Sequence, residues 1–206
     1  MLKEFIRHLF PQIVLRENLK ITYTFCLGGL AFTVLIVLVI SGLLLLFYYQ
    51  PVPSRAFASI LFLEEKVFGG SYLRSLHRLA SHALLILIFL HTLRVILTGA
   101  YQKPRDLNWI TGFIILCLVL LTAYTGYLLP LDQLALWATR TGMELITVVP
   151  GGSLIRTLLV PDGVNGPLTL LRFYILHIVL LPLMIFLLVS LHFYRIRKNK
   201  GILPYL

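Results

Sequence analysis

Four stretches of the chain consist almost entirely of apolar residues, and polar residues gather between them. The stretches cover about residues 25–47, 79–97, 109–129 and 173–194. Each is long enough to span a membrane, because about 20 helical residues cross a hydrocarbon core of roughly 30 Å. The segment 130–171 is too polar to span and is predicted to lie along the outer surface as short helices. The pattern predicts an all-α integral membrane protein, a bundle of four transmembrane helices.

Composition supports a membrane protein and argues against a soluble one. Of the 206 residues, 59% are hydrophobic and 13% are charged. The hydrophobic share exceeds what the core of a soluble protein of this size needs. A net charge of +10 would elsewhere suggest nucleic acid, but here the basic residues flank the apolar stretches. The polar N-terminal stretch does not resemble a cleavable signal peptide. Both cysteines lie in apolar stretches, so no disulfide framework is expected.

The basic residues also predict the direction of the chain. Four spans place both termini on one side, together with the connection between the second and third spans. The basic residues on that side are Lys3, Arg7, Arg16, Lys20, Lys103, Arg105, Arg195, Arg197, Lys198 and Lys200. The opposite side carries most of the acidic residues. The positive-inside rule therefore predicts both termini on the cytoplasmic or inner side.

Two of the spans carry a pair of histidines each. His77 and His91 are 14 residues apart, and His177 and His192 are 15 apart. At about 100° and 1.5 Å per residue, the two histidines of a span share one face within about 40° or 60° and lie roughly 21–22 Å apart. An imidazole inside a bilayer needs a hydrogen-bond or metal partner, so each histidine is a candidate functional residue.

The direction of the chain decides how these histidines meet. The second and fourth spans both run inward, so His77 and His177 form one pair, called here the first pair. His91 and His192 form the second pair. Two bis-imidazole sites across a membrane suit two haems, because iron takes imidazole on both axial faces of the flat tetrapyrrole. The four histidines are therefore predicted as iron ligands of two stacked b haems, which would form a transmembrane electron path.

A histidine in a membrane span can also have a role without haem. A lone membrane histidine is often a hydrogen-bonded packing residue, and a transporter or channel can relay protons through histidines. His82 is about 140° round the helix from His77, so it and His8 are interpreted as ordinary polar residues. Matched spacing on two spans favours haem, and a reduced-minus-oxidised spectrum would separate haem from a transporter.

The glycines of the other two spans repeat the histidine spacing. Gly28 and Gly42 are 14 residues apart, as are Gly112 and Gly126. A flat macrocycle packed against a helix needs positions without side chains. Packing of small residues between membrane helices is the alternative, and the shared period of 14 favours haem.

Longer motifs accompany this pattern. They are "GYLLPLDQLALWA", "FYYQPVPSRAFASI", "LTGAYQKPRDLNWITG" and "LRFYILHIVLLPL" followed by "LHFYRIRK". Together they resemble the cytochrome b/b6 family, in particular cytochrome b6 of the cytochrome b6f complex, from about Ile21 to Gly201. Mitochondrial-type cytochrome b has 13 residues between the histidines of its fourth helix, whereas 14 intervene here, as in the b6 type. The resemblance implies a single cytochrome b N-terminal-type domain over residues 1–206, with the remaining helices in a separate subunit IV.

The resemblance assigns the haem sites to the two sides of the membrane. It implies a low-potential haem at the first pair, near the outer side, and a high-potential haem at the second pair, near the inner side. Arg74 and Arg78 flank the outer haem and Arg94 lies near the inner one, where arginines can pair with haem propionates. Snorkelling at a helix end explains these arginines equally well.

Cys26 adds a third cofactor through the same resemblance. In "FCLGGL" it matches the family cysteine that makes one thioether bond to a c-type haem without the C-x-x-C-H sequence. Gly28 and Gly29 leave room beside it, and Arg197 matches the family arginine near the propionates of that haem. From the residues alone, Cys26 is an apolar packing cysteine, as is Cys117, which has no counterpart role.

One departure from the family pattern lies in the turn after the third span. The family reads Pro-Trp-Asp-Gln there, and this chain has Leu131 in place of the tryptophan. Losing a large aromatic near the quinol pocket would change quinone fit or partner docking without touching haem ligation.

The implied function is electron transfer in a quinol-oxidising cytochrome b6f/bc-type complex. Electrons would pass from outer quinol through two b haems to an inner quinone, supporting proton translocation across a bacterial plasma membrane or thylakoid membrane. The chain would be one subunit of a quinol:cytochrome c/plastocyanin-type oxidoreductase and inactive alone. The alternative is a di-haem b membrane anchor that exchanges quinol electrons with a non-Rieske redox module.

The implied partners follow from that assignment. They are a subunit IV-type cytochrome b C-terminal protein, a Rieske iron–sulfur protein, a c-type cytochrome, quinol and quinone, lipid, and a second copy of the whole complex in a homodimer. A Rieske gene and a subunit IV gene beside this gene would favour the b6f/bc assignment over the anchor.

Overall fold

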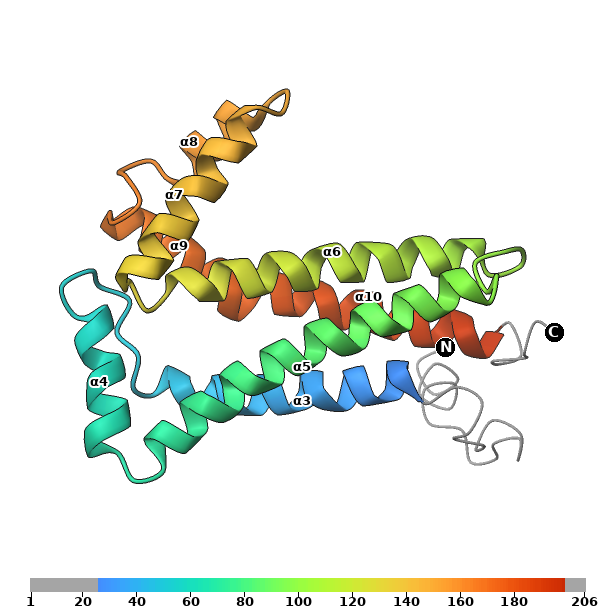
Figure 1. The fold of residues 1–206 in the computed structure, drawn as a ribbon, viewed down its shortest axis with the longest axis horizontal. Coiled ribbons are helices and arrows are strands. Elements are labelled where there is room, and N and C mark those ends of the chain that lie inside the picture. The colour runs from blue at the N-terminus through green and yellow to red at the C-terminus, as the bar shows by residue number, and fades with distance from the viewer. Residues whose placement is uncertain (1–25, 199–206) are drawn as a thin grey trace. The chain divides into compact units, whose positions relative to one another are not determined.

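The structure of the chain, a computed structural model, describes residues 26–198. Within that range every regular element is helical, so the predicted all-α fold is confirmed (Figure 1). His8 and the basic N-terminal arm lie outside the described residues. Four described helices are long and apolar enough to cross a membrane: α3 (Leu27–Leu46), α5 (Gly70–Leu97), α6 (Asp106–Leu128) and the continuous helix Pro167–Lys198.

The fourth helix consists of three consecutive parts. They are α9 (Pro167–Ile175), the π-helical turn η2 (Leu176–Leu180) and α10 (Leu181–Lys198). The second and fourth helices, with 28 and 32 residues, are longer than the apolar stretches that predicted them. Their polar ends continue the helix beyond the length that a hydrocarbon core requires.

Shorter helices occupy the polar connections. α4 (Ala56–Lys66) joins α3 to α5, and the segment predicted as surface helices contains α7 (Gln133–Thr147) and α8 (Gly152–Leu159). The Asp132 side chain accepts a hydrogen bond from the Ala135 amide at 2.8 Å and so caps α7. Side-chain caps of this kind satisfy amides that a helix leaves unpaired at its start.

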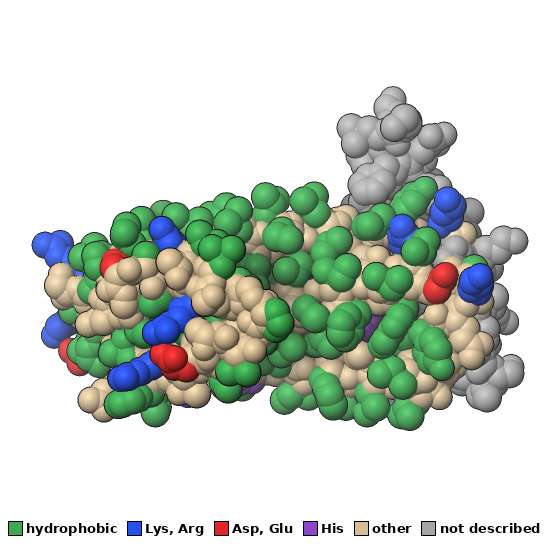
Figure 2. Space-filling model, turned by 90° about the horizontal axis from the view of Figure 1, so that it is seen from above, with side chains coloured by type: hydrophobic (Ala, Val, Ile, Leu, Met, Phe, Trp, Pro, Cys, Tyr) green, Lys and Arg blue, Asp and Glu red, His purple; other side chains and the backbone are tan. Residues whose placement is uncertain are grey.

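Hydrophobic side chains dominate the surface of the long helices. Hydrophobic side chains spread over the face that Figure 2 shows. A soluble protein would bury most of this apolar area, whereas a bilayer solvates it. The chain is therefore an integral membrane protein.

The described chain divides into two compact units, and the division cuts each of the four long helices. The first unit contains His82–Leu120 with the described residues before Val37 and after Pro182, and the second contains Val37–Ser81 and Leu121–Pro182. The second pair of histidines lies in the first unit and the first pair in the second unit. That residues 1–206 form a single domain stays a prediction.

Aromatic side chains join the helices within each unit. In the first unit, Phe32 of α3 and Phe193 of α10 meet edge to face with ring centroids 5.1 Å apart. In the second unit, the Tyr49 hydroxyl donates to the Leu129 carbonyl at 2.6 Å and links the end of α3 to the end of α6. Burial, and next the neighbouring Tyr174, raise the pKa of Tyr49 above its ordinary value, so the phenol stays a hydrogen-bond donor.

Candidate functional site

The first pair brings two imidazoles from different helices close together. His77 lies on α5 and His177 on η2, and their ring centroids are 6.4 Å apart with the ring planes at 75°. Bonds of about 2 Å from one metal to a nitrogen of each ring separate two ring centroids by roughly 6 Å. The spacing of the first pair therefore fits one metal ion between the two rings.

Each imidazole of the first pair turns its Nδ1 atom toward a neighbouring helix. The Nδ1 of His77 lies 2.8 Å from the Ser41 hydroxyl of α3. The Nδ1 of His177 lies 2.9 Å from the Thr122 carbonyl of α6. A carbonyl only accepts, so the Nδ1 of His177 carries the proton and its Nε2 keeps a lone pair. Metal-bound histidines commonly have this second-shell arrangement.

The second pair also brings together imidazoles from two helices. His91 lies on α5 and His192 on α10, close enough for an electrostatic interaction between them. Among the described residues, the Nδ1 of His192 has no hydrogen-bond partner. The Asn108 backbone approaches His192 but does not meet hydrogen-bond geometry. The two pairs therefore differ in what holds their rings.

The four glycines that repeat the histidine spacing each face one imidazole. A Cβ atom at these positions would meet Cε1 of the opposite ring: Gly28 with His91 at 3.2 Å, Gly42 with His77 at 3.2 Å, Gly112 with His192 at 3.2 Å, and Gly126 with His177 at a still closer approach. The glycine period predicts room for the flat face of a macrocycle. The structure gives a more direct reason, because a Cβ atom at any of these positions would crowd the facing imidazole, most severely at Gly126.

The donor set suits haem better than a bare metal ion. In the described part of the chain, no cluster of three or more His, Cys, Asp or Glu side chains is placed to hold a metal. Two imidazoles alone provide too few ligands for a protein metal site. An iron porphyrin brings four equatorial nitrogens and needs only two axial ligands, so each pair fits that group.

The π turn explains the unequal spacing of the histidines on the two helices. Pro182 lacks an N–H group, and in a regular helix its ring would collide with the carbonyl of Ile178. Widening the preceding turn into η2 avoids this collision and accommodates one extra residue. The 15-residue spacing from His177 to His192 then matches the 14-residue spacing on α5. If both helices were regular α-helices, the extra residue would change the rotation of one histidine relative to the other by about 100°. The two histidines of the fourth helix could then not match those of α5.

Deleting Val179 from η2 is therefore expected to leave both predicted b haems in place. The deletion removes the extra residue that the π turn accommodates and restores a 14-residue spacing. Deleting Leu85 from the regular helix α5 is the matched control, and it should rotate His91 by about 100° relative to His77 and lose haem. The haem-to-protein ratio and the reduced-minus-oxidised spectrum of the membrane-inserted variants measure this. Equal haem loss in both deletions would contradict it.

The predicted arginines take different positions. Arg74 forms an ion pair with Glu64 of α4, so its side chain already has an anionic partner. Arg78 is exposed, and Arg94 lies close enough to His91 for an electrostatic interaction. The Nη1 atom of Arg197 is buried without a hydrogen-bond partner among the described residues, which makes Arg197 the predicted arginine best placed to receive an anionic group.

Cys26 stands directly before α3, in the unit that holds the second pair. Its side chain is exposed, and its carbonyl accepts a hydrogen bond from the Leu30 amide at 2.8 Å. Its φ of 45° lies in the left-handed region, which L side chains rarely adopt. Leu131, the residue that departs from the family pattern, also has a positive φ of 51° and packs against the core around Phe173.

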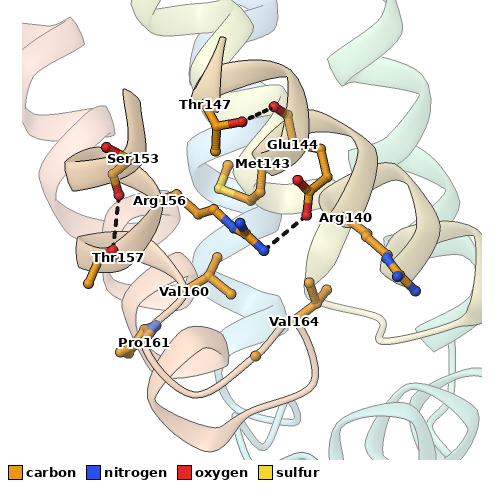
Figure 3. A pocket seen from close by; sticks show the side chains of 11 residues that line it. Arg140, Met143, Glu144, Thr147, Ser153, Arg156, Thr157, Val160, Pro161 and Val164 are labelled. Carbon is orange, nitrogen blue, oxygen red and sulfur yellow. Dashed lines mark hydrogen bonds and ion pairs between the residues drawn. The ribbon is translucent and has the colours of Figure 1, made fainter. Parts of the chain in front are cut away.

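A separate pocket of about 620 Å³, with both polar and apolar lining residues, lies between α7, α8 and the loop that follows α8 (Figure 3). The ion pair between Arg156 and Glu144, at 2.9 Å, crosses it. Arg140 also lines the pocket and lies over the ring of Trp137. None of the sequence-predicted site residues lines this pocket.

Known proteins resemble this chain over nearly its whole length. The profile of the family described as cytochrome b/b6/petB matches residues 13–200. The menaquinol:cytochrome c reductase cytochrome b subunit of Bacillus subtilis (strain 168) is 39% identical over 202 residues, which are 97% of this chain and 90% of that protein. Cytochrome b6 of Heliobacterium modesticaldum (strain ATCC 51547 / Ice1) is 40% identical over 196 residues, 95% of this chain and 89% of that protein.

A solved structure gives the same result for the fold. A chain of a hyperthermophilic respiratory Complex III superposes with a TM-score of 0.82 at 28% sequence identity. The match covers 98% of this chain but only 53% of that chain, so this chain spans about half the length of its structural relative. The family profile extends over nearly the whole sequence, and the curated relatives match this chain over most of their own length. This chain therefore belongs to the cytochrome b/b6 family.

Proposed function

We propose that this chain is the b6-type cytochrome b subunit of a quinol:cytochrome c reductase complex, with one b haem at each histidine pair. The observation that carries the proposal is the pairing itself. The helix α5 and the continuous helix Pro167–Lys198 each supply one imidazole to each pair. A glycine of α3 or α6 lies against every ring. A proton-relaying transporter has no need for imidazoles matched in this way.

The side chains around the first pair favour axial ligation. The Thr122 carbonyl accepts from Nδ1 of His177, which leaves the Nε2 lone pair of that ring for iron. Bound haem would supply one-electron redox chemistry, so that one electron of a quinol can cross the membrane. Partial burial of the four rings limits their contact with water, and the glycines let the rings lie close against α3 and α6.

The proposal includes an orientation. Both termini lie on the cytoplasmic or inner side, because the basic residues of the α5–α6 connection and of the end of α10 would then face it. The first pair is nearer the outer quinol-oxidising site, and the second pair is nearer the inner quinone. The membrane is a bacterial plasma membrane or a thylakoid membrane.

A split complex is part of the proposal. The curated relatives named cytochrome b6 and cytochrome b subunit are matched over 89% and 90% of their own length, and we infer that a subunit IV-type protein supplies further helices of cytochrome b. A Rieske iron–sulfur protein and a c-type cytochrome would take the other quinol electron outward. The complex would be embedded in lipid as a homodimer, and its final acceptor is a cytochrome c or a plastocyanin-type protein.

A third haem is part of the proposal. Cys26 would form one thioether bond to a haem c beside the second pair, and Arg197 would pair with its propionates. The exposed thiol at the start of α3 and the buried, unpartnered Nη1 of Arg197 support this assignment. Arg74, Arg78 and Arg94 are proposed as weaker contacts to the propionates of the b haems.

Turnover of the isolated chain tests the split complex. The purified chain alone is expected to show the reduced-minus-oxidised spectrum of two b haems and negligible transfer of electrons from quinol to cytochrome c. Adding the subunit IV-type protein and the Rieske protein should restore turnover. Robust turnover by the single chain would contradict the split complex, and a chain without any haem spectrum would contradict the proposed function.

A further inference from the structure

The Ser41 hydroxyl stands between the backbone of its own helix and a predicted haem ligand. Ser41 is buried on α3, and its Oγ lies 2.7 Å from the Val37 carbonyl and 3.2 Å from the Leu38 carbonyl. The same oxygen lies 2.8 Å from Nδ1 of His77. Gly42, the next residue, faces Cε1 of that ring, so two consecutive residues of α3 contact one imidazole.

The geometry decides which atom donates. A serine hydroxyl has one hydrogen and two acceptor lone pairs, and the carbonyls of α3 accept that hydrogen. The oxygen can then only accept from His77, so Nδ1 carries the ring proton and Nε2 is left with its lone pair. Ser41 thereby fixes both the tautomer and the rotation of the His77 ring.

The second pair offers an internal comparison. Thr111 precedes Gly112 on α6 as Ser41 precedes Gly42 on α3, and Gly112 faces the His192 ring. The Thr111 hydroxyl bonds to the Leu107 carbonyl at 2.9 Å, but Nδ1 of His192 has no partner among the described residues. A hydroxyl residue directly before a glycine therefore contacts the ring nitrogen at Ser41 but not at Thr111, and the Asn108 backbone is the polar group that faces His192.

We propose that Ser41 is a positioning residue that orients His77 and lowers the reduction potential of the haem held by the first pair. The inference rests on the proposed function, which places a haem there. An acceptor on Nδ1–H makes an imidazole a more basic ligand, and a more basic ligand favours ferric over ferrous iron. Because no hydroxyl among the described residues supports His192 in this way, the difference between the pairs favours electron flow from the first pair to the second.

Potentiometric titration of the full chain in its complex tests the proposal. Ser41→Ala removes the hydroxyl acceptor and leaves only the Leu38 backbone facing His77. The midpoint potential of the first-pair haem is expected to rise by about 59 mV, which corresponds to about a tenfold loss of ferric preference for one electron. The potential of the second-pair haem should not change. Ser41→Thr keeps a hydroxyl and should restore the wild-type potential.

Thr111→Val is the matched control, because it removes a hydroxyl with the same place in its helix but no contact with an imidazole nitrogen. It is expected to shift neither potential. An unchanged first-pair potential in Ser41→Ala, or equal shifts in Ser41→Ala and Thr111→Val, would overturn the role of Ser41 while two haems remain visible. A wild-type chain without b haem would instead overturn the proposed function.

Discussion

Replacing His91 with leucine is expected to remove one b haem and leave the other in place. The first pair loses no ligand, no glycine contact and no hydrogen bond in this variant. The b-haem content should fall by about half, since each iron needs both of its axial imidazoles. The reduced-minus-oxidised spectrum of inserted protein should lose the higher-potential component and keep the lower-potential one.

His82→Leu provides the control for a histidine on the same helix. His82 is exposed and belongs to neither pair, so this variant should keep both haems with unchanged spectra. Loss of both haems in His91→Leu, in protein that is still inserted, would contradict independent sites. Haem loss in His82→Leu would show that the paired histidines are not the full set of ligands.

The division of the chain into units gives a physical reason for this independence. Each histidine pair, with the two glycines that face it, lies inside one unit. The polar partners of the first pair, Ser41 and Thr122, belong to the same unit as that pair. A substitution at one pair therefore leaves the contacts around the other intact.

The sequence predicts the membrane fold because hydrophobic length is a strong signal. The uncharged stretch that forms α3 permits little but a spanning helix, and the predicted all-α class is confirmed. Helix boundaries were less predictable. α5 begins at Gly70, nine residues before the apolar stretch. A helix can continue into polar residues beyond the hydrocarbon core, and hydrophobic length does not predict such an extension.

The candidate site can be predicted only in part from the sequence. A spacing of 14 or 15 residues suggests which histidines share a face, but it does not reveal the π turn that brings the two spacings into agreement. A π turn depends on how Pro182 is accommodated, and a kink in a regular α-helix is another way to accommodate a proline. The glycines stand out by their period, yet their contact with the imidazoles depends on how the helices pack.

The polar partners of the imidazoles were missed altogether. Ser41 and Thr125, whose hydroxyl lies 3.4 Å from Nδ1 of His177, are single hydroxyl residues in apolar spans. Serine and threonine in such spans commonly bond to their own helix. Their position directly before Gly42 and Gly126 was an available signal. It is incomplete, because Thr111 has the same position before Gly112 and contacts no imidazole nitrogen.

The proposed haem c at Cys26 gives the second large expected effect. A thioether is covalent, so haem should stay with the polypeptide through denaturing electrophoresis and give a peroxidase stain at 23.5 kDa. Haem held only by imidazoles leaves when the helices separate. Cys26→Ser should therefore abolish the stain and leave both b-haem bands in the reduced-minus-oxidised spectrum.

Cys117→Ser is the matched control, because Cys117 is the other exposed cysteine and has no proposed ligand. This variant should keep the full stain. The exposed thiol of Cys26 lies two residues before Gly28, whose backbone faces His91, so a haem attached there would lie beside the second pair. Wild-type protein matured with its native assembly factors decides the question. If it shows no stain after denaturation, the thioether does not form and the cofactors reduce to the two b haems.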